Sequence, residues 1–137
     1  MIYISELIGY EQNDLNAPYW FLNRVSFNIE NINDILSNLD ISIKSFLCNT
    51  DYYDYTALPY VDLYEVEKAY LEVLNNKLVT NKLIRLPREE FENEFSEIFE
   101  HELGGTYEYC HWRDFYKQYK IRTLVEWCRE NKLPYIK

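Results

Sequence analysis

Glycine and proline are scarce in this 137-residue sequence, with three and four copies respectively. A chain so poor in both residues has no flexible linker, and its turns must rely on Asn and Asp. No apolar run approaches the ~18 residues that a transmembrane helix requires. The N-terminus also lacks the basic start and apolar core of a signal peptide. We therefore expect a cytoplasmic protein with no membrane partner.

Cysteine is limited to Cys48, Cys110 and Cys128, an odd number without paired spacing. This pattern argues against a secreted disulfide framework and favours a reducing compartment. Together with His101 and His111, these residues are of types that bind zinc, but they lack the short paired spacings typical of zinc sites. We expect no metal and no cofactor. Instead, Cys48 and Cys128 are predicted to be buried and His101 to lie on a helix surface.

Catalytic motifs are missing as well. The sequence has neither a Gly-x-Ser-x-Gly elbow nor a glycine-rich phosphate loop. His101-Glu102 begins like a His-Glu-x-x-His motif, but Gly105 stands where the second histidine should be. We therefore expect no catalytic residue. A small hydrolase that uses His101, His111 and the carboxylates is kept as the third class of function.

Acidic and aromatic residues are abundant and unevenly placed. Residues 1–103 carry 19 acidic and 7 basic side chains, whereas residues 104–137 carry 4 and 7, and the net charge is −9. An aromatic content of 18% separates this chain from disordered acidic sequences and supplies a core. A surface rich in carboxylates repels nucleic acid and anionic membranes and attracts basic proteins. The composition therefore predicts a binder of a basic protein.

The first half of the sequence predicts a small sheet. Residues rich in β-branched and aromatic side chains predict strands over 2–8, 19–29 and 41–48, with a turn between the first two. Asn31 is positioned to cap a short helix over 32–39. The resulting fold class is α+β, with a small N-terminal ββαβ-like sheet followed by a helix-rich C-terminal half. We expect one compact domain over residues 1–137, with a division into 1–80 and 81–137 as the alternative.

Helical spacing dominates the second half. One helix is predicted to start at Asp62 and end near Asn75, and another to start at Pro87 and stop at Gly104-Gly105. A last helix is expected over 121–131. The pattern over 77–86 is ambiguous, and a strand is one of the structures it allows. The predicted buried residues of the two later helices are Phe91, Phe95, Ile98, Phe99, Leu124, Val125 and Cys128.

Two acidic groups are the candidate binding surfaces. The first is a Tyr/Asp segment over 51–64, and tyrosine is enriched in binding hot spots. The second is the outer face of the Pro87 helix, whose glutamates must mostly face water. A simply solvated face, and tyrosines packed over the core, are the alternative interpretations. The predicted partner-binding residues are Asp51, Tyr52, Tyr53, Asp54, Tyr55, Asp62, Glu65, Glu89, Glu90, Glu94 and Glu97.

The first half of the chain resembles the ArdA antirestriction proteins. The likeness rests on Tyr3-Ile4, Leu7, Tyr10, Leu15 and Trp20-Phe21, followed by a short helix, a strand and an Asp-Tyr element in similar order, and it covers roughly residues 1–75. The resemblance implies an elongated acidic dimer that imitates bent duplex DNA and occupies the DNA groove of type I restriction–modification enzymes. From Lys77 onward the sequence shows no match, and its basic end departs from the family pattern.

The leading hypothesis is therefore a non-catalytic inhibitor that occupies the basic surface of a nucleic-acid enzyme. In it, Asp51, Asp54, Asp62, Glu65, Glu89, Glu90, Glu94 and Glu97 replace phosphates, while Tyr52, Tyr53 and Tyr55 supply contact area. The runner-up is an immunity protein or antitoxin that neutralises a bacterial toxin. Both predict a basic protein partner and no direct nucleic-acid binding, and a homodimer is left open.

Overall fold

The structure, a computed structural model, describes residues 1–14, 16–74, 76–102 and 106–137, with the backbone alone at 101 and 102. The chain divides into two compact units. Unit 1 comprises residues 1–61 and 121–137, and unit 2 comprises residues 62–120. The sequence-based expectation of one compact domain, with a division after residue 80 as the alternative, stays a prediction. None of the described helices has the length and hydropathy needed to cross a membrane.

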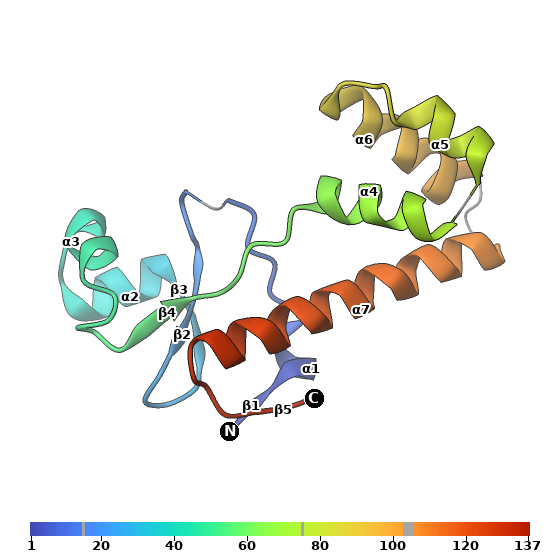
Figure 1. Cartoon of the computed structure of the whole chain (residues 1–137). Coiled ribbons are helices and arrows are strands. Elements are labelled where there is room, and N and C mark those ends of the chain that lie inside the picture. Colours follow the sequence, from blue (N-terminus) through green and yellow to red (C-terminus); the bar gives the residue numbers. More distant parts are fainter. Residues whose placement is uncertain (15, 75, 103–105) are drawn as a thin grey trace. The chain divides into compact units, whose positions relative to one another are not determined.

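Unit 1 contains two small sheets and several helices (Figure 1). Its central strand β2 lies between β3 and β4 in an antiparallel three-stranded sheet, and β1 pairs in parallel with β5. The elements are β1 (Ile2–Tyr3), α1 (Ile4–Leu7), β2 (Trp20–Asn23), β3 (Ile29–Asn31), α2 (Ile32–Leu39), α3 (Ile43–Cys48), β4 (Tyr55–Ala57), the later part of α7 (Tyr107–Glu130) and β5 (Tyr135–Ile136).

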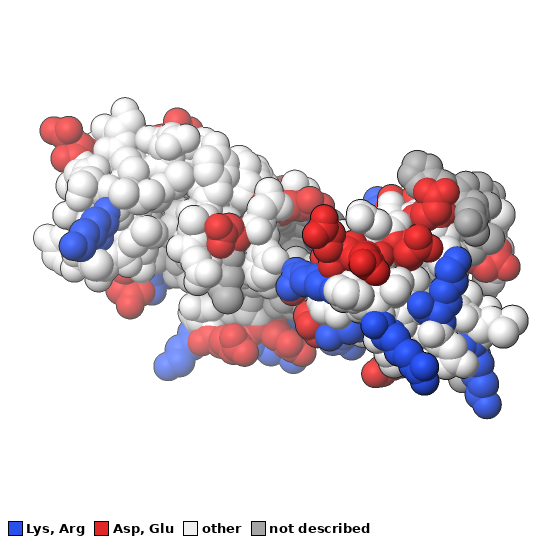
Figure 2. All heavy atoms as spheres, turned by 90° about the horizontal axis from the view of Figure 1, so that it is seen from above, with Lys and Arg blue, Asp and Glu red and all other residues white. Residues whose placement is uncertain are grey.

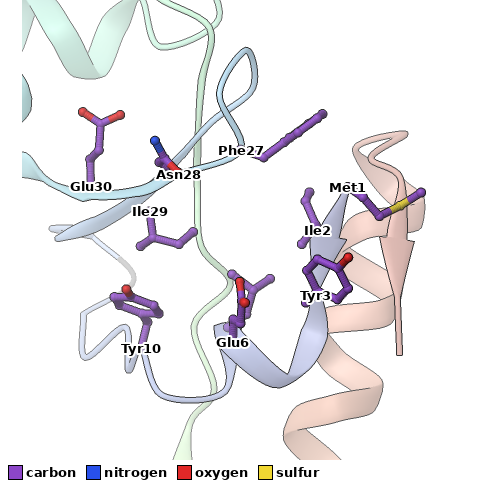
Figure 3. Close-up of a pocket in the computed structure, with 10 residues that line it drawn as sticks. Met1, Ile2, Tyr3, Glu6, Tyr10, Phe27, Asn28, Ile29 and Glu30 are labelled. Carbon is purple, nitrogen blue, oxygen red and sulfur yellow. The ribbon is translucent and has the colours of Figure 1, made fainter.

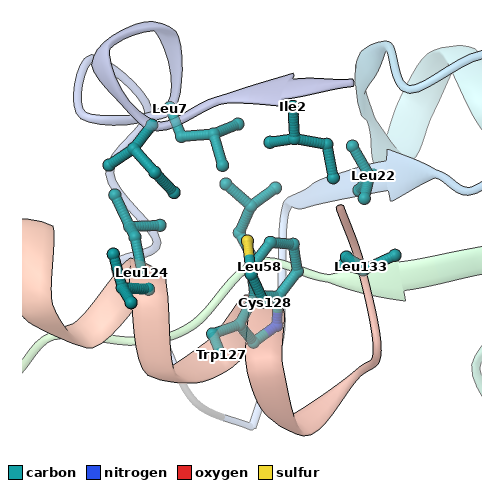
Figure 4. Close-up of a cluster of buried hydrophobic side chains, with 10 residues drawn as sticks. Ile2, Leu7, Leu22, Leu58, Leu124, Trp127, Cys128 and Leu133 are labelled. Atoms are coloured by element: carbon teal, nitrogen blue, oxygen red, sulfur yellow. The ribbon is translucent and has the colours of Figure 1, made fainter. Parts of the chain in front are cut away.

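Strand β2 is covered on both faces. Successive side chains of a strand point to opposite sides, and the neighbouring residues Phe21 and Leu22 are both fully buried. Phe21 packs with residues of α2, α3 and β4 in one hydrophobic cluster. Leu22 packs in a second cluster with N-terminal residues and the end of α7, including Trp127 and Cys128 (Figure 4). The sheet is therefore the middle layer of unit 1.

The side chain of Gln12 joins the N-terminal segment to this sheet, and it is only 6% exposed. Its Nε2 donates to the carbonyl oxygens of Trp20 and Leu58, at 3.0 and 3.1 Å. Its Oε1 accepts from the backbone N–H groups of Tyr19 and Trp20, at 2.7 and 3.0 Å. One buried amide thus satisfies backbone groups on β2 and on the segment that follows β4.

Unit 2 is helical. It consists of α4 (Leu63–Leu74), α5 (Lys77–Leu83), α6 (Arg88–Ser96), a π-helical turn η1 (Glu97–Glu102) and the first part of α7. Its core is largely aromatic, with Tyr70 of α4 fully buried against Phe99 and Trp112 at centroid distances of 5.6 and 5.1 Å. Phe91 and Phe95 of α6 are also buried. Aromatic rings contribute large buried areas, which compensates for the small size of this unit.

The α+β class, with a small N-terminal sheet and a helix-rich C-terminal half, is confirmed. The predicted helix over 32–39 is also confirmed, and Asn31 caps it by accepting from the Asp34 N–H at 2.9 Å. The helix starts predicted at Asp62 and Pro87 agree with α4 and α6. The buried stripe Phe91, Phe95, Ile98 and Phe99 is confirmed. The stop predicted at Gly104-Gly105 lies outside the described residues.

Three strand predictions are wrong in part or in full. In the segment predicted as a strand over 41–48, residues Ile43–Cys48 form α3 instead, because the Ser42 hydroxyl caps a helix at the Ser45 N–H. The strand predicted over 19–29 is a hairpin, because Asn23 Oδ1 accepts from the N–H groups of Val25 and Ser26 and turns the chain. Residues 2–8 are strand only at Ile2–Tyr3 and then helical.

Two helices differ from the sequence-based expectation. Residues Lys77–Leu83 are helical, because Asn76 accepts from the N–H groups of Leu78 and Val79. The last helix begins at Tyr107, well before the predicted start at Ile121. Its first turns contribute Trp112 to the core of unit 2, while Leu124, Val125 and Cys128 are buried as predicted.

Replacing Gln12 by leucine should lower the free energy of unfolding by ~2–4 kcal/mol, because buried backbone groups lose their partners. The exposed neighbour Asn13, replaced by leucine, is the control and should change stability by less than ~0.5 kcal/mol. Urea unfolding followed by tryptophan fluorescence measures both variants. Equal stability of the two would contradict a structural role for the Gln12 amide.

Candidate partner-binding surfaces

The loop after α3 presents the start of the Tyr/Asp segment. The Arg24 guanidinium holds this loop, because its Nη2 donates to the Asp51 carbonyl oxygen at 3.1 Å and approaches the Asp51 carboxylate at 3.3 Å. The backbone N–H of Arg24 also donates to the Asp54 carbonyl oxygen at 2.8 Å. Asp54 has a φ of 61°, a left-handed conformation that aspartate tolerates better than most residues. Both aspartates are exposed at the surface of unit 1.

The three tyrosines of this loop have different environments. Tyr52 is 81% exposed and packs edge-on against the half-buried Tyr53, with ring centroids 5.0 Å apart. Tyr55 is buried, and its hydroxyl donates to Glu30 Oε1 at 3.0 Å. Burial and the Glu30 carboxylate raise the pKa of Tyr55. Tyr52 is therefore the main aromatic contact that the loop offers, whereas Tyr55 is a core residue.

The second candidate surface is the outer face of α6 and η1 in unit 2. Phe91, Phe95, Ile98 and Phe99 anchor the inner face in the aromatic core. Glu89, Glu90 and Glu97 are exposed on the outside, whereas Glu94 is half-buried. Within the described part of the chain, no lysine or arginine pairs with Glu89, Glu90 or Glu97. We call these three residues the α6 acidic face.

The other predicted acids of unit 2 have basic neighbours. Asp62 caps α4 and accepts from Arg88 Nη2 at 2.7 Å, and Arg88 Nε lies 3.4 Å from Glu92. The two further pairs are Glu65 with Lys68 and Glu94 with Lys82, at 3.2 and 3.7 Å. Figure 2 shows acidic and basic side chains next to one another on one face of the helices of unit 2. Asp62 is thus brought beside the start of α6. The acidic side chains of unit 2 do not form an uninterrupted surface, because Lys and Arg side chains lie between them.

A buried carboxyl group, Glu67 on α4, was not among the predicted residues. Its side chain is 3% exposed, and its Oε1 has no hydrogen-bond partner among the described residues. Burial, and then the charges of Glu92, Glu100 and Asp62, raise the pKa of Glu67 to about 8. The helical spacing of Glu67 from Tyr70 and Leu71 is the sequence signal that places it on the apolar face. Glu67 is mostly protonated at neutral pH, so it adds little to the acidic surface.

One histidine and two cysteines have environments that bear on the sequence-based predictions. The Tyr70 hydroxyl lies 2.9 Å from His111 Nδ1 on α7, and the Tyr107 ring stacks on His111. Cys128 is buried as predicted, and burial raises its pKa. Cys48 was predicted to be buried, but its place at the exposed end of α3 makes this prediction wrong.

In the part of the chain that the structure describes, the residues considered as metal ligands do not form a cluster. Among side chains that the structure describes, no three His, Cys, Asp or Glu residues form a group able to hold a metal ion. The predicted surface position of His101 concerns a side chain outside the described part of the chain. The expectation of neither metal nor catalysis stays a prediction.

The residues that resemble the ArdA family occupy structural positions in unit 1. Ile4 and Leu7 belong to one buried cluster and Phe21 to another, while Tyr10 packs edge-on against Trp20 at 4.9 Å. Leu15 lies outside the described residues. No protein-family model matches the chain, and neither a curated protein nor a solved structure gives a significant match. The resemblance stays a prediction.

Glu67 should make the stability of unit 2 depend on pH. Its pKa is about 8 in the folded chain and near the ordinary value of 4.5 when unfolded, so the folded chain binds this proton more tightly. Stability should therefore fall as pH rises from about 4.5 to 8, by up to ~1.4 kcal/mol per pH unit, and the fall should level off above pH 8. Urea unfolding at a series of pH values measures this slope.

The Glu67→Gln variant keeps the shape of the side chain and removes the titrating group. We expect it to flatten the slope and to be more stable than the wild type above pH 8. Glu65→Gln, an exposed change on the same helix, is the control and should keep the slope. An unchanged slope in Glu67→Gln would show that Glu67 titrates at an ordinary pKa.

Proposed function

We propose that this chain is a non-catalytic acidic protein of the cytoplasm that inhibits a nucleic-acid enzyme by occupying its basic surface. The observation that carries the proposal is the α6 acidic face, where Glu89, Glu90 and Glu97 are exposed and stand without a basic partner among the described residues. The aromatic core behind α6 holds this face in place. A fixed array of carboxylates is complementary to a cleft that binds phosphates.

Both candidate surfaces have a physical role in the proposed binding. Complementary fields speed the encounter of the two proteins, and charge pairs that lose water in the complex slow its dissociation. Asp51 and Asp54 of unit 1 provide a second set of exposed carboxylates, with Tyr52 as the aromatic contact between them. The partial resemblance to ArdA proteins supports a type I restriction–modification enzyme as the target.

The second candidate is an immunity protein or antitoxin that binds a basic nuclease toxin. One observation favours it over DNA mimicry. Arg88 lies between Asp62 and Glu92, and Lys82 lies beside Glu94, so the acids of unit 2 are interrupted by basic side chains. A patch of mixed charge is complementary to one particular protein surface. It is less complementary to a DNA-binding cleft, whose phosphate-binding residues are uniformly basic.

Inhibition assays with purified enzymes separate the two candidates. DNA cleavage by a type I restriction enzyme, and by a set of basic nuclease toxins, is measured with increasing amounts of the chain. Inhibition of the restriction enzyme supports mimicry, and inhibition of one toxin alone supports immunity. Either inhibition should weaken as NaCl rises from about 50 to about 500 mM, because salt screens exposed charges. Affinity that does not change with salt would contradict electrostatic binding.

Reversing the charge of the α6 acidic face should weaken inhibition at least about tenfold, because two attractive contacts become repulsive. The variant is Glu89→Lys with Glu90→Lys. Its control is Glu126→Lys with Glu130→Lys, which gives the same net charge change at exposed positions of α7 in unit 1. The concentration that halves enzyme activity is measured for both. Equal loss in the two variants would assign the effect to net charge rather than to this face.

The variant Tyr52→Ala removes the exposed ring. It should weaken binding about fivefold or more and change the free energy of unfolding by less than ~0.5 kcal/mol. Tyr55→Phe is the matched control, because the Tyr55 ring is buried and loses only its hydroxyl. Isothermal titration calorimetry with the inhibited enzyme measures both affinities. Wild-type affinity in Tyr52→Ala would remove the loop from the interface.

A further inference from the structure

A hollow of about 550 Å³ lies in unit 1, lined by residues between 1 and 10 and between 27 and 30. The N-terminal segment forms one side of it with Tyr3, Glu6 and Tyr10, and the chain entering β3 forms the other side with Phe27, Asn28 and Ile29 (Figure 3). This volume is within the range of pockets that hold small organic groups. The hollow therefore has room for a side chain.

The walls of the hollow combine aromatic surface with two carboxylates, those of Glu6 and Glu30. Tyr3 and Tyr10 are 47% and 36% exposed, and the Tyr10 ring is held edge-on against Trp20 at 4.9 Å. Glu6 is exposed, and Figure 3 shows it between Tyr10 and Tyr3. No lysine or arginine among the described residues pairs with the Glu6 carboxylate.

Glu30 also lines the hollow, but its carboxylate is already used. One oxygen accepts from the Tyr55 hydroxyl at 3.0 Å, and the other accepts from Asn23 Nδ2 at 3.2 Å. Glu6 is therefore the acidic group available to a ligand. Carboxylates beside aromatic rings repel anions and attract a cation that has a flat or apolar surface.

We propose that this hollow binds an arginine side chain of the basic protein partner. The guanidinium would pair with the Glu6 carboxylate and lie against the rings of Tyr3 and Tyr10, while its methylene groups contact Ile29. Arginine fits better than lysine, because its planar head both stacks on rings and meets a carboxylate with two donors. The identity of the ligand as a protein side chain rests on the function proposed above.

The test uses N-acetyl-arginine methylamide as the probe, titrated into the ¹⁵N-labelled full chain and followed by NMR. We expect saturable shifts confined to residues 1–10 and 27–30. The citrulline analogue has nearly the same shape without the charge, and it should bind at least about tenfold more weakly. Equal binding of the two compounds, or shifts centred elsewhere in the chain, would overturn the proposal.

Glu6→Gln should weaken arginine binding at least about tenfold, because the neutral amide loses the charge-assisted pair. Glu126→Gln, an exposed change on α7, is the matched control and should bind as the wild type does. The spectrum of each variant without ligand checks that the fold is kept. If Glu6→Gln binds arginine normally, the carboxylate has no role and the assignment fails.

The enzyme inhibition assay separates this inference from the proposed function. A chain that inhibits a nuclease but does not bind the arginine probe keeps the proposed function and loses this site. A chain that binds the probe through Glu6 but inhibits neither class of enzyme keeps the cation site and loses the proposed partner. If both hold, Glu6→Gln should also weaken inhibition.

Discussion

The buried amide of Gln12 is the interaction on which unit 1 most depends. Strand β2 must be covered on both faces, because Phe21 and Leu22 enter different hydrophobic clusters. A segment that covers one face brings backbone groups into the interior, and these groups need partners. The four hydrogen bonds of Gln12 provide them at the point where the N-terminal segment, β2 and the chain after β4 meet. The loop at Asp51 and the hollow at Glu6 are both positioned by elements that this sheet holds.

In unit 2 the corresponding constraint is a core made mostly of rings. Tyr70, Phe95, Phe99 and Trp112 pack closely enough to exclude water from the inner faces of α4 and α6. The carboxyl group of Glu67 falls inside this dry region, where the charged form is disfavoured. Acidic residues of the same helices therefore divide into two kinds. Those on the outside are exposed and can attract a basic surface, whereas the carboxyl group of Glu67 is buried and adds little to that attraction.

Local signals in the sequence predicted those elements that local chemistry decides. Asn31, Asp62 and Pro87 begin helices through hydrogen bonds or a fixed φ within one turn, so neighbouring residues were enough. The wrong strand prediction over 41–48 was also decided by local chemistry, a helix cap that the alternation of apolar residues obscured. The alternation of Ile41 and Ile43 resembles a strand, but the Ser42 cap favours a helix there.

Burial of individual residues was harder to predict than the elements themselves. Tyr55 lies between residues that resemble a surface loop, yet its ring enters the cluster of Phe21 and Phe46, which are distant in sequence. Of the predicted binding residues, the exposed ones on α6 followed from the helical period alone. Gln12 could not have been identified in this way, because its bonding partners come from β2 and from the segment after β4.

The positions of the cysteines have a practical consequence for chemical labelling. Cys48 and Cys110 are exposed thiols in unit 1 and unit 2 respectively, whereas Cys128 is buried with a raised pKa. A maleimide reagent reacts with the thiolate, so accessible thiols are modified well before a buried one. The natural chain thus carries one attachment point for a spin label or fluorophore in each unit. A distance between the two units becomes measurable in solution without introducing a cysteine.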